Sequence, residues 1–191
     1  MRGYFGVGIE RISKPMNVGS IFRTTHAFGG SFVFTVAAMY AEDKGRLADT
    51  SNAPASLPFY GFPDMQSMLL PKDCSLVGVE LTPDAVELPS FRHPRQAAYI
   101  LGPERGSLSA GMTERCEFVV KIPMKFCVNV GVAAAIIMYD RLISLGRFPD
   151  RPIMPGGPTD ALPETIFGGP KIRNKWKKFR TLPPDDLPEI D

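Results

Sequence analysis

The fold of this 191-residue chain is decided by residues 3–36, which read GYFGVGIERISKPMNVGSIFRTTHAFGGSFVFTV. Residues 3–10 and 31–36 are short apolar runs rich in residues that favour strands. The segment between them carries four residues at helical spacing, namely Val18, Ile21, Phe22 and Thr25. A strand, a helix and a second strand in this order predict an α/β fold with a parallel sheet.

The two ends of the predicted helix carry recognisable signals. Asn17 stands just before the periodic residues, and we expect its side chain to cap the helix by accepting a hydrogen bond from a free backbone N–H group. Gly29 and Gly30 follow the last periodic residue, and glycine commonly ends a helix because it tolerates a positive φ. We therefore predict a helix that begins at Asn17 and ends before Gly29.

Further elements follow along the chain. Short apolar runs predict strands over residues 75–81, 97–101 and 118–122. Residues 128–145 predict a long apolar helix, and residues 63–70 a short one. Residues 41–60 are mostly polar and contain two prolines, which favours a surface loop.

Composition limits the class of protein. Hydrophobic residues make up 44% of the chain and charged residues 22%, which is typical of a globular domain. No apolar run approaches the roughly 18–20 residues of a membrane helix, and the first residues lack the pattern of a secretion signal. Cys74, Cys116 and Cys127 form no paired motif, so we expect neither disulfides nor a metal site. We expect no membrane partner and a reducing, cytoplasmic location.

The chain changes character after Gly146. Residues 148–170 are rich in proline and glycine, which favours an extended segment. Residues 171–180 then read KIRNKWKKFR, with six cations and no acid, although the net charge of the whole chain is only +2. We therefore predict a globular domain over residues 1–147 and an extended arm with a basic segment over residues 148–191.

Three segments carry candidate chemistry: NVGSIFR at 17–23, ILGPERGSL at 100–108 and IPMKFCVN at 122–129. A glycine turn after a strand is a common ligand site at the carboxyl ends of parallel strands. Each segment alone also fits an ordinary structural role. These roles are a capped amphipathic helix with a solvated arginine, a tight turn with a solvated ion pair, and a capped core helix.

Together and in this order, the three segments resemble the SpoU (TrmH-type) RNA 2′-O-ribose methyltransferases of the SPOUT superfamily. The resemblance covers about residues 4 to 145. It implies a parallel-sheet SPOUT fold with a C-terminal deep trefoil knot, and a homodimer. It also implies that residues 1–147 are a catalytic domain that transfers a methyl group from S-adenosylmethionine to a ribose 2′-hydroxyl of tRNA or rRNA.

The resemblance also assigns site residues. It implies catalytic roles for Arg23, Asn17, Glu104 and Asn129. It implies cofactor binding by Leu81, Leu101, Gly102, Ile122, Met124 and Val128. Because a guanidinium effectively never loses its proton, we interpret Arg23 as an anchor for a phosphate or a developing alkoxide rather than as a general base. We expect Glu104 to hold an arginine by a bidentate contact, within the chain or across the dimer interface.

The third segment departs from the family pattern in two ways. Cys127, Val128 and Asn129 stand where the family usually has Ser-Leu-Asn. We interpret Cys127 as a small buried thiol rather than as a nucleophile. The spacing from Met124 to Asn129 is also short, so we expect the methionine side of the cofactor pocket to be rearranged.

RNA contacts are expected from Arg23 and from cations and an aromatic of the basic segment: Lys171, Arg173, Lys175, Trp176, Lys177, Lys178 and Arg180. Cations bind phosphates, and aromatic rings stack on unpaired bases. The same segment also fits a solvated basic tail, or an arm that packs Trp176 on a partner subunit.

Alternative functions remain open from the sequence. One is a non-catalytic RNA-binding protein that retains the SPOUT fold, which the altered Cys127 region allows. A nucleotide-dependent oxidoreductase is disfavoured, because no Rossmann glycine fingerprint follows the first strand. Within the superfamily, methylation of a base instead of a ribose is a further alternative.

Overall fold

A computed structural model describes residues 3–39, 57–153 and 155–157, and the chain divides into two compact units, residues 1–148 and 149–191. The first unit contains the strands β1 (Tyr4–Glu10), β2 (Phe32–Val36), β3 (Phe59–Phe62), β4 (Ser75–Val79), β5 (Val86–Glu87), β6 (Gln96–Leu101) and β7 (Phe118–Lys121). Its helices are α1 (Pro15–Ala27), the 3₁₀ turn η1 (Leu88–Ser90), α4 (Ala110–Arg115) and α5 (Val130–Leu145).

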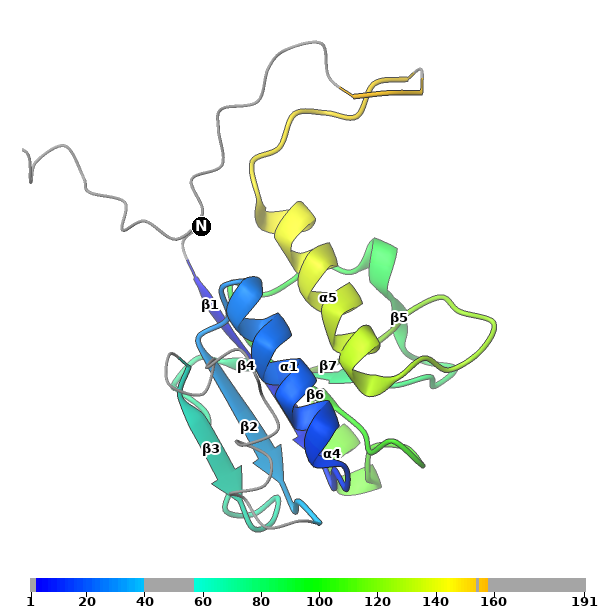
Figure 1. Ribbon diagram of the computed structural model, residues 1–191. Coiled ribbons are helices and arrows are strands. Elements are labelled where there is room, and N and C mark those ends of the chain that lie inside the picture. Colours follow the sequence, from blue (N-terminus) through cyan, green and yellow to red (C-terminus); the bar gives the residue numbers. More distant parts are fainter. Residues whose placement is uncertain (1–2, 40–56, 154, 158–191) are drawn as a thin grey trace, which may run out of the picture. The chain divides into compact units, whose positions relative to one another are not determined.

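The strands form one sheet in the order β3-β2-β1-β6-β4-β7-β5, and every neighbouring pair is parallel (Figure 1). The predicted parallel α/β sheet is therefore confirmed. β1 lies inside the sheet, between β2 and β6, so its backbone is paired on both sides. All strands run in one direction, so their carboxyl ends meet at a single edge of the sheet.

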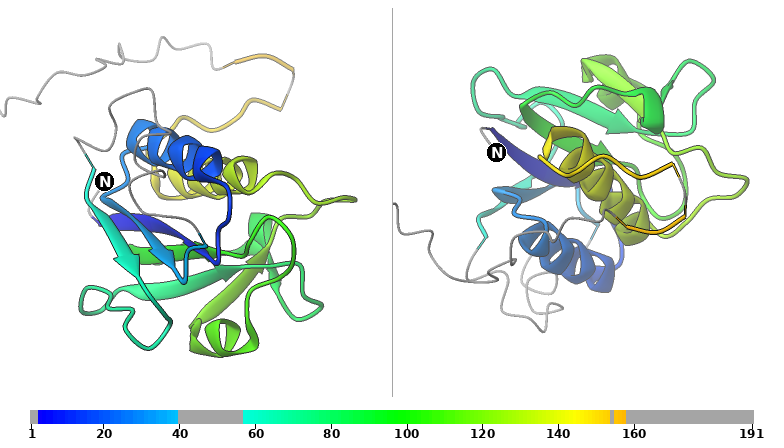
Figure 2. Two further views of the ribbon diagram at one scale, coloured as in Figure 1. Left: turned by 60° about the horizontal axis from the view of Figure 1, so that its bottom comes forward. Right: turned by 90° about the horizontal axis from the view of Figure 1, so that it is seen from above.

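The helices cover both faces of the sheet (Figure 2). α1 and α5 pack together on one face, where Ile21 and Phe22 of α1 and Ile137 of α5 join the larger of two buried clusters. α4 covers the other face, where Met112 packs in a second cluster with Met68 from the connection after β3. The sheet thus separates two hydrophobic cores, as both faces of a parallel sheet must be covered.

Glycines of β1 allow aromatic rings to lie directly on the strand. Phe5, Val7 and Ile9 point to the α1–α5 face, as the two-residue alternation of a strand requires. Gly6 and Gly8 point to the other face. A Cβ at Gly6 would lie 2.2 Å from the Phe32 ring, and a Cβ at Gly8 would lie 2.2 Å from the ring of Phe34. The glycines therefore give these rings room to pack flat on the sheet.

The start of α1 differs from the sequence prediction. The helix begins at Pro15, with Lys14 in the N-cap position and no side-chain cap. A proline fits the first helical position, because its fixed φ is already helical and its missing N–H needs no partner. Asn17 is consequently inside the first turn, and the prediction that it caps the helix is wrong. The predicted end is confirmed, since Gly29 has a φ of +73° and its N–H bonds to His26 O.

Three other predictions need correction. Residues 63–70 contain turns and no helix, because Arg115 donates to the backbone oxygens of Met65 and Met68 and holds this stretch against α4. Residues 59–60 belong to β3 and not to a loop, since β2 supplies a parallel partner for this edge strand. The rest of that predicted loop, up to residue 56, lies outside the described residues. The short elements β5 and α4 had no sequence signal long enough to predict.

The long helix α5 follows the prediction closely. Asn129 caps it, with its side-chain oxygen accepting from the Gly131 N–H at 2.8 Å, and Gly146 follows its last residue. No helix among the described residues is long and apolar enough to cross a membrane.

Candidate cofactor and catalytic site

A cavity of about 350 Å³ opens at the carboxyl edge of the sheet. Four connections supply its walls: the one after β1 together with the start of α1, and those after β4, β6 and β7. This volume falls within the range of small-molecule sites, which is about 300–1,000 Å³. Ligands of parallel α/β sheets bind at this same edge.

All six residues predicted to bind the cofactor line this cavity: Leu81, Leu101, Gly102, Ile122, Met124 and Val128. They come from three separate connections, after β4, β6 and β7. Three of the four predicted catalytic residues, Asn17, Glu104 and Asn129, line it as well. The structure thus brings the three sequence segments together, while the roles of these residues stay predictions.

Asn17, Glu104 and Asn129 form one hydrogen-bonded chain. The Asn17 side-chain amide donates to Glu104 Oε1 at 2.9 Å, and Asn129 Nδ2 donates to Asn17 Oδ1 at 3.2 Å. Asn17 therefore uses both ends of its amide to join the first turn of α1 to the connections after β6 and β7. This explains why its side chain is not used as a helix cap.

The Glu104 carboxylate is surrounded by donors. Its Oε1 also accepts from the Lys14 N–H at 3.1 Å, and its Oε2 accepts from the N–H of Ser13 at 3.3 Å and from the Ser13 hydroxyl at 3.1 Å. Burial alone would raise the pKa of Glu104. The hydrogen bonds from Asn17 and from backbone N–H groups outweigh burial and lower the pKa below its ordinary value. Glu104 is therefore charged at neutral pH.

The geometry shows where two groups of the expected arginine contacts lie, Glu104 and Arg23, while the roles of both stay predictions. Within the described residues of this chain, the Glu104 oxygens accept from Ser13, Lys14 and Asn17 rather than from an arginine, because the loop folds onto the start of α1. Contact with an arginine of a second subunit stays a prediction. Arg23 is exposed on α1 and does not line the cavity of its own chain, since it follows Asn17 by about 9 Å of helix rise.

Sequence reasoning missed Glu80, which directly follows β4 and lines the cavity. Its Oε1 accepts from the Leu81 N–H at 2.9 Å, and its Oε2 accepts from the Leu108 N–H at 2.7 Å. The carboxylate therefore joins the connection after β4 to the end of the loop after β6. A Cβ at Gly102 would lie 2.9 Å from Leu108 N, so this loop closes tightly on itself at the same point.

A second carboxylate fixes the same loop from β1. Glu10, which is 4% exposed, accepts from the Ser109 N–H at 2.7 Å and from the Ser109 hydroxyl at 2.5 Å. Arg11 donates to Ser107 O at 2.8 Å. The only sequence signal for this role was an acid at the carboxyl end of a buried strand, where parallel strands place ligand-binding loops.

Cys127 is exposed and lines the cavity, so the prediction of a buried thiol is wrong. The chain from Met124 to Asn129 connects β7 to the cap of α5. Met124 and the following Val130 pack in the larger hydrophobic core, whereas the residues between them belong to neither core. The thiol therefore stays at the cavity surface. Residues 158–191, and with them all the predicted RNA-binding residues of the arm, lie outside the described residues.

Solved structures share this fold. The SpoU methyltransferase AviRb from Streptomyces viridochromogenes, crystallised with the cofactor AdoMet, superposes with a TM-score of 0.68 and 24% sequence identity. The match covers 77% of this chain and 60% of that one. At this identity the likeness establishes the fold class, an α/β fold of the SpoU methyltransferase type.

The chain belongs to the SpoU rRNA methylase family, whose model matches residues 5–139. The resemblance noted in the sequence is thereby confirmed. The mouse tRNA (guanosine(18)-2′-O)-methyltransferase is 26% identical over 137 residues, which are 68% of this chain and 9% of that protein. The 23S rRNA (guanosine-2′-O-)-methyltransferase of Nitrosomonas europaea is 28% identical over 143 residues, 69% of this chain and 53% of that protein. The chain thus spans about a tenth and about half of the lengths of these curated relatives.

Proposed function

We propose that this chain transfers the methyl group of S-adenosylmethionine to a ribose 2′-hydroxyl of an RNA. One observation carries this proposal: a single cavity at the carboxyl edge of the sheet contains residues of all three family segments. Membership of the SpoU family supports the reaction, and curated relatives named as tRNA and rRNA 2′-O-methyltransferases support the class of acceptor.

The cavity suits an adenosine-containing cofactor. Its walls combine apolar side chains such as Leu101 and Ile122 with the backbone of the loop at Gly102. Flat apolar walls and backbone groups are what an adenine needs for packing and for edge hydrogen bonds. We assign cofactor binding to Leu81, Leu101, Gly102, Ile122, Met124 and Val128. When bound, S-adenosylmethionine supplies an electrophilic methyl group, so the protein has to orient the acceptor and stabilise its charge.

The polar residues divide these tasks. Glu104 is charged and accepts from N–H and O–H donors, so it holds Asn17 and the start of α1 in place. Asn17 bonds to Glu104 in the connection after β6 and to Asn129 in the connection after β7, so it holds the two connections together at the cavity. Arg23, on the exposed side of α1, binds the acceptor phosphate or stabilises the developing alkoxide.

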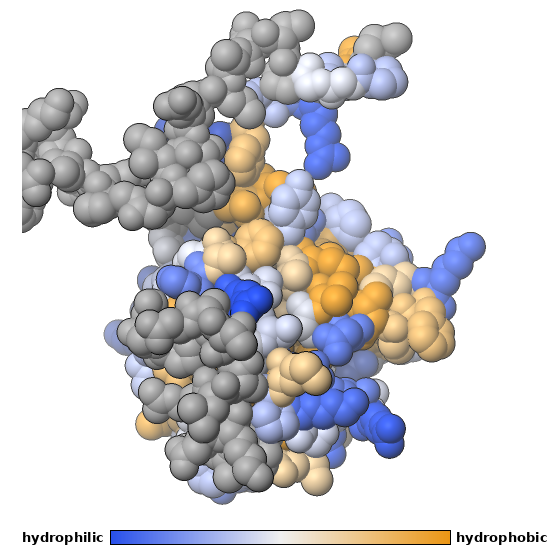
Figure 3. Space-filling model, viewed as in Figure 1, coloured by the Kyte–Doolittle hydropathy of each residue, from blue (hydrophilic) through white to orange (hydrophobic). Residues whose placement is uncertain are grey.

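We also propose the family's C-terminal deep trefoil knot and a homodimer. The knot is supported by the way three connections, after β4, β6 and β7, converge on one cavity. The dimer is supported by an exposed apolar stripe on α5, where Val132, Tyr139 and Ile143 are 49%, 52% and 36% exposed at helical spacing. Hydrophobic side chains gather over α5 in Figure 3. Light scattering in solution tests the dimer.

We also propose a division of the chain into a catalytic domain and an arm. Residues 1–147 form the catalytic domain, and residues 148–191 form an arm whose basic segment binds RNA. Cys74 and Cys116 are free thiols, which supports a reducing, cytoplasmic location. Deletion of residues 171–191 should weaken RNA binding and reduce its salt dependence.

Calorimetry with S-adenosylmethionine, followed by mass-spectrometric mapping of the modified nucleotide, tests the function. We expect binding of the cofactor and a methyl group on a ribose 2′-oxygen. If millimolar cofactor does not bind while RNA does, the chain is a non-catalytic RNA-binding protein with this fold. A methyl group on a base would leave the cofactor assignment intact and overturn the acceptor. Comparison of total RNA from cells with and without the protein identifies the RNA.

A further inference from the structure

The mouth of the cavity is bordered by three exposed residues on two loops. Arg105 lies between Glu104 and Gly106, which both line the cavity, and is itself exposed. On the loop after β7, Lys125 and Phe126 lie between the cavity-lining Met124 and Cys127, and both are exposed. We call Arg105, Lys125 and Phe126 the rim.

Phe126 is 85% exposed, more than any other aromatic residue in the described part of the chain. It belongs to neither hydrophobic core and makes no ring contact with another described aromatic. Leaving a phenyl ring in water forgoes about 1.5–3 kcal/mol of burial, and among the described residues Phe126 does not recover this by packing in either core. The ring is therefore placed for contact with another molecule.

The charges around the cavity indicate which molecule fits. The carboxylates of Glu80 and Glu104 are occupied by backbone and side-chain donors, so they face the protein. The cations Arg11, Lys14, Arg105 and Lys125 are exposed on the connections that build the cavity, and they outnumber the exposed acid of these connections, Asp84. An excess of exposed cations at this edge attracts a polyanion.

We propose that the rim holds a single-stranded segment of RNA beside the acceptor ribose, with the Phe126 ring stacked on an unpaired base and Lys125 and Arg105 on phosphates. This inference rests on the proposed function and deepens it. Bases inside a duplex are already stacked on their neighbours, so an isolated ring can reach a base face only where the RNA is unpaired.

Substitutions at Phe126 test the stacking. Binding of a fluorescein-labelled single-stranded RNA and of unfractionated tRNA is measured by fluorescence anisotropy. We expect Phe126→Ala to weaken binding about tenfold, Phe126→Leu to weaken it to a similar extent, and Phe126→Trp to preserve it. Wild-type affinity in Phe126→Ala would overturn the inference, and wild-type affinity in Phe126→Leu would overturn the stacking.

Substitutions of the cations test the phosphate contacts. In Lys125→Gln and in Arg105→Gln, the slope of log affinity against log salt should each fall by about 0.7–0.9, the contribution of one phosphate contact. Lys72→Gln is the matched control, because Lys72 is exposed next to the opposite edge of the sheet, before β4 begins. Equal slopes in the rim variants and the control would contradict the phosphate contacts.

Two further measurements separate this inference from its alternatives. Cofactor affinity by calorimetry should be unchanged in the rim variants, since the rim borders the cavity and does not line it. A change of subunit association in Phe126→Ala, without loss of RNA affinity, would assign the ring to a contact with a second copy of the chain and overturn the inference. If the wild-type chain binds no S-adenosylmethionine, the proposed reaction is wrong. The RNA measurements still show whether the rim residues contact RNA.

Discussion

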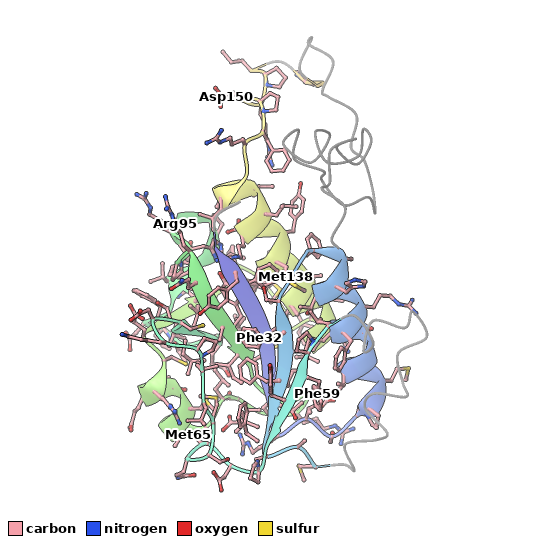
Figure 4. All side chains as sticks on the ribbon, turned by 90° about the vertical axis from the view of Figure 1, so that its left-hand side faces the viewer. Phe32, Phe59, Met65, Arg95, Met138 and Asp150 are labelled. Carbon is pink, nitrogen blue, oxygen red and sulfur yellow. The ribbon has the colours of Figure 1, made fainter. Side chains whose placement is uncertain are left out.

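The two edges of the sheet use polar side chains in opposite ways. At the carboxyl edge, Glu80 and Glu104 are partly exposed and hold loops around an open cavity. At the amino edge, the side chains of His93 and Arg141 are buried, and they bind the Tyr99 hydroxyl and the backbone. Figure 4 shows the separation, with Arg95 at the amino edge and Met65 at the other.

The centre of the amino edge is Arg141 of α5, which is 1% exposed. It donates to the backbone oxygens of Pro94 at 2.5 Å, Arg95 at 2.7 Å and Tyr4 at 3.3 Å, and to the Tyr99 hydroxyl at 3.0 Å. Its guanidinium carbon also lies 5.2 Å from the centre of the Phe5 ring. These contacts tie the end of α5 to the beginnings of β1 and β6.

From Arg141 a directed chain of hydrogen bonds reaches the surface. His93 Nε2 lies 2.8 Å from the Asp140 carboxylate, and Nδ1 lies 2.6 Å from the Tyr99 hydroxyl. A carboxylate only accepts, so Nε2 carries the proton of neutral His93 and Nδ1 accepts from Tyr99. The Tyr99 hydroxyl and both ring nitrogens of His93 thus have partners inside the protein. The buried polar groups at the amino edge therefore stabilise the fold, whereas the carboxylates at the carboxyl edge hold the loops that form the walls of the proposed cofactor cavity.

The largest effect is expected from substitution of Arg23, on the helix that begins at the carboxyl edge. We expect Arg23→Ala to lower kcat by about 100- to 1,000-fold, because it removes a cation from the developing charge, while cofactor affinity stays the same. Methylation assays and calorimetry measure the two effects. His26→Ala, another exposed position of α1, is the control and should be fully active. A fully active Arg23→Ala would remove Arg23 from the site.

Substitution of Arg141 tests the other edge. We expect Arg141→Met to cost about 3 kcal/mol of unfolding free energy, because three partly buried backbone oxygens and the Tyr99 hydroxyl lose the hydrogen bonds that Arg141 donates. Urea unfolding measures this change. At temperatures where the variant stays folded, its cofactor affinity should equal that of the wild type. A loss of cofactor affinity in the folded variant would show that the two edges are coupled.

Substitution of Glu80 should have a smaller effect, which is confined to the cavity. Glu80→Ala frees the N–H groups of Leu81 and Leu108, so the two wall segments lose their common acceptor. We expect cofactor affinity to fall about tenfold, since about 1.4 kcal/mol corresponds to a lost charge-assisted contact, with kcat at saturation little changed. Glu87→Ala is an exposed acidic control on β5. Equal affinities in both variants would contradict the role of Glu80 in holding the wall.

The smallest effect is a pH dependence at the amino edge. Burial lowers the pKa of His93 below its ordinary 6.5, although hydrogen bonding to Asp140 opposes this. The unfolded chain therefore takes up a proton at a higher pH than the folded chain does. The stability from neutral His93 is fully present above about pH 6.5 and is lost as the pH falls through the folded-state pKa.

Thermal unfolding at about pH 7.5 and about pH 5.5 measures this loss. We expect the melting temperature of the wild type to fall more between these values than that of His93→Gln, which has no titrating ring. An equal fall in both proteins would assign the pH dependence to other groups.

Much of the site could be predicted because its segments have ordered, recognisable patterns. The strand and helix periodicity of residues 3–36 predicted the parallel sheet, and Asn129 before a long apolar run predicted a cap. The sequence could not predict that Asn17 bonds Glu104, since 87 residues separate them and Pro15 already starts the helix. Glu10 and Glu80 were missed for the same reason: an acid after a strand acquires its role only when a distant loop folds onto it.

The position of β1 has a consequence for synthesis of the chain. The first strand pairs with β6 through partners such as Tyr4 and Gln96, which are separated by most of the sheet's sequence. At about 5–20 residues per second, a ribosome needs roughly 5–20 s to make that stretch. During this time β1 has an unpaired edge and an apolar face. This interior strand of the finished sheet is therefore also the part of the nascent chain that depends longest on protection from aggregation.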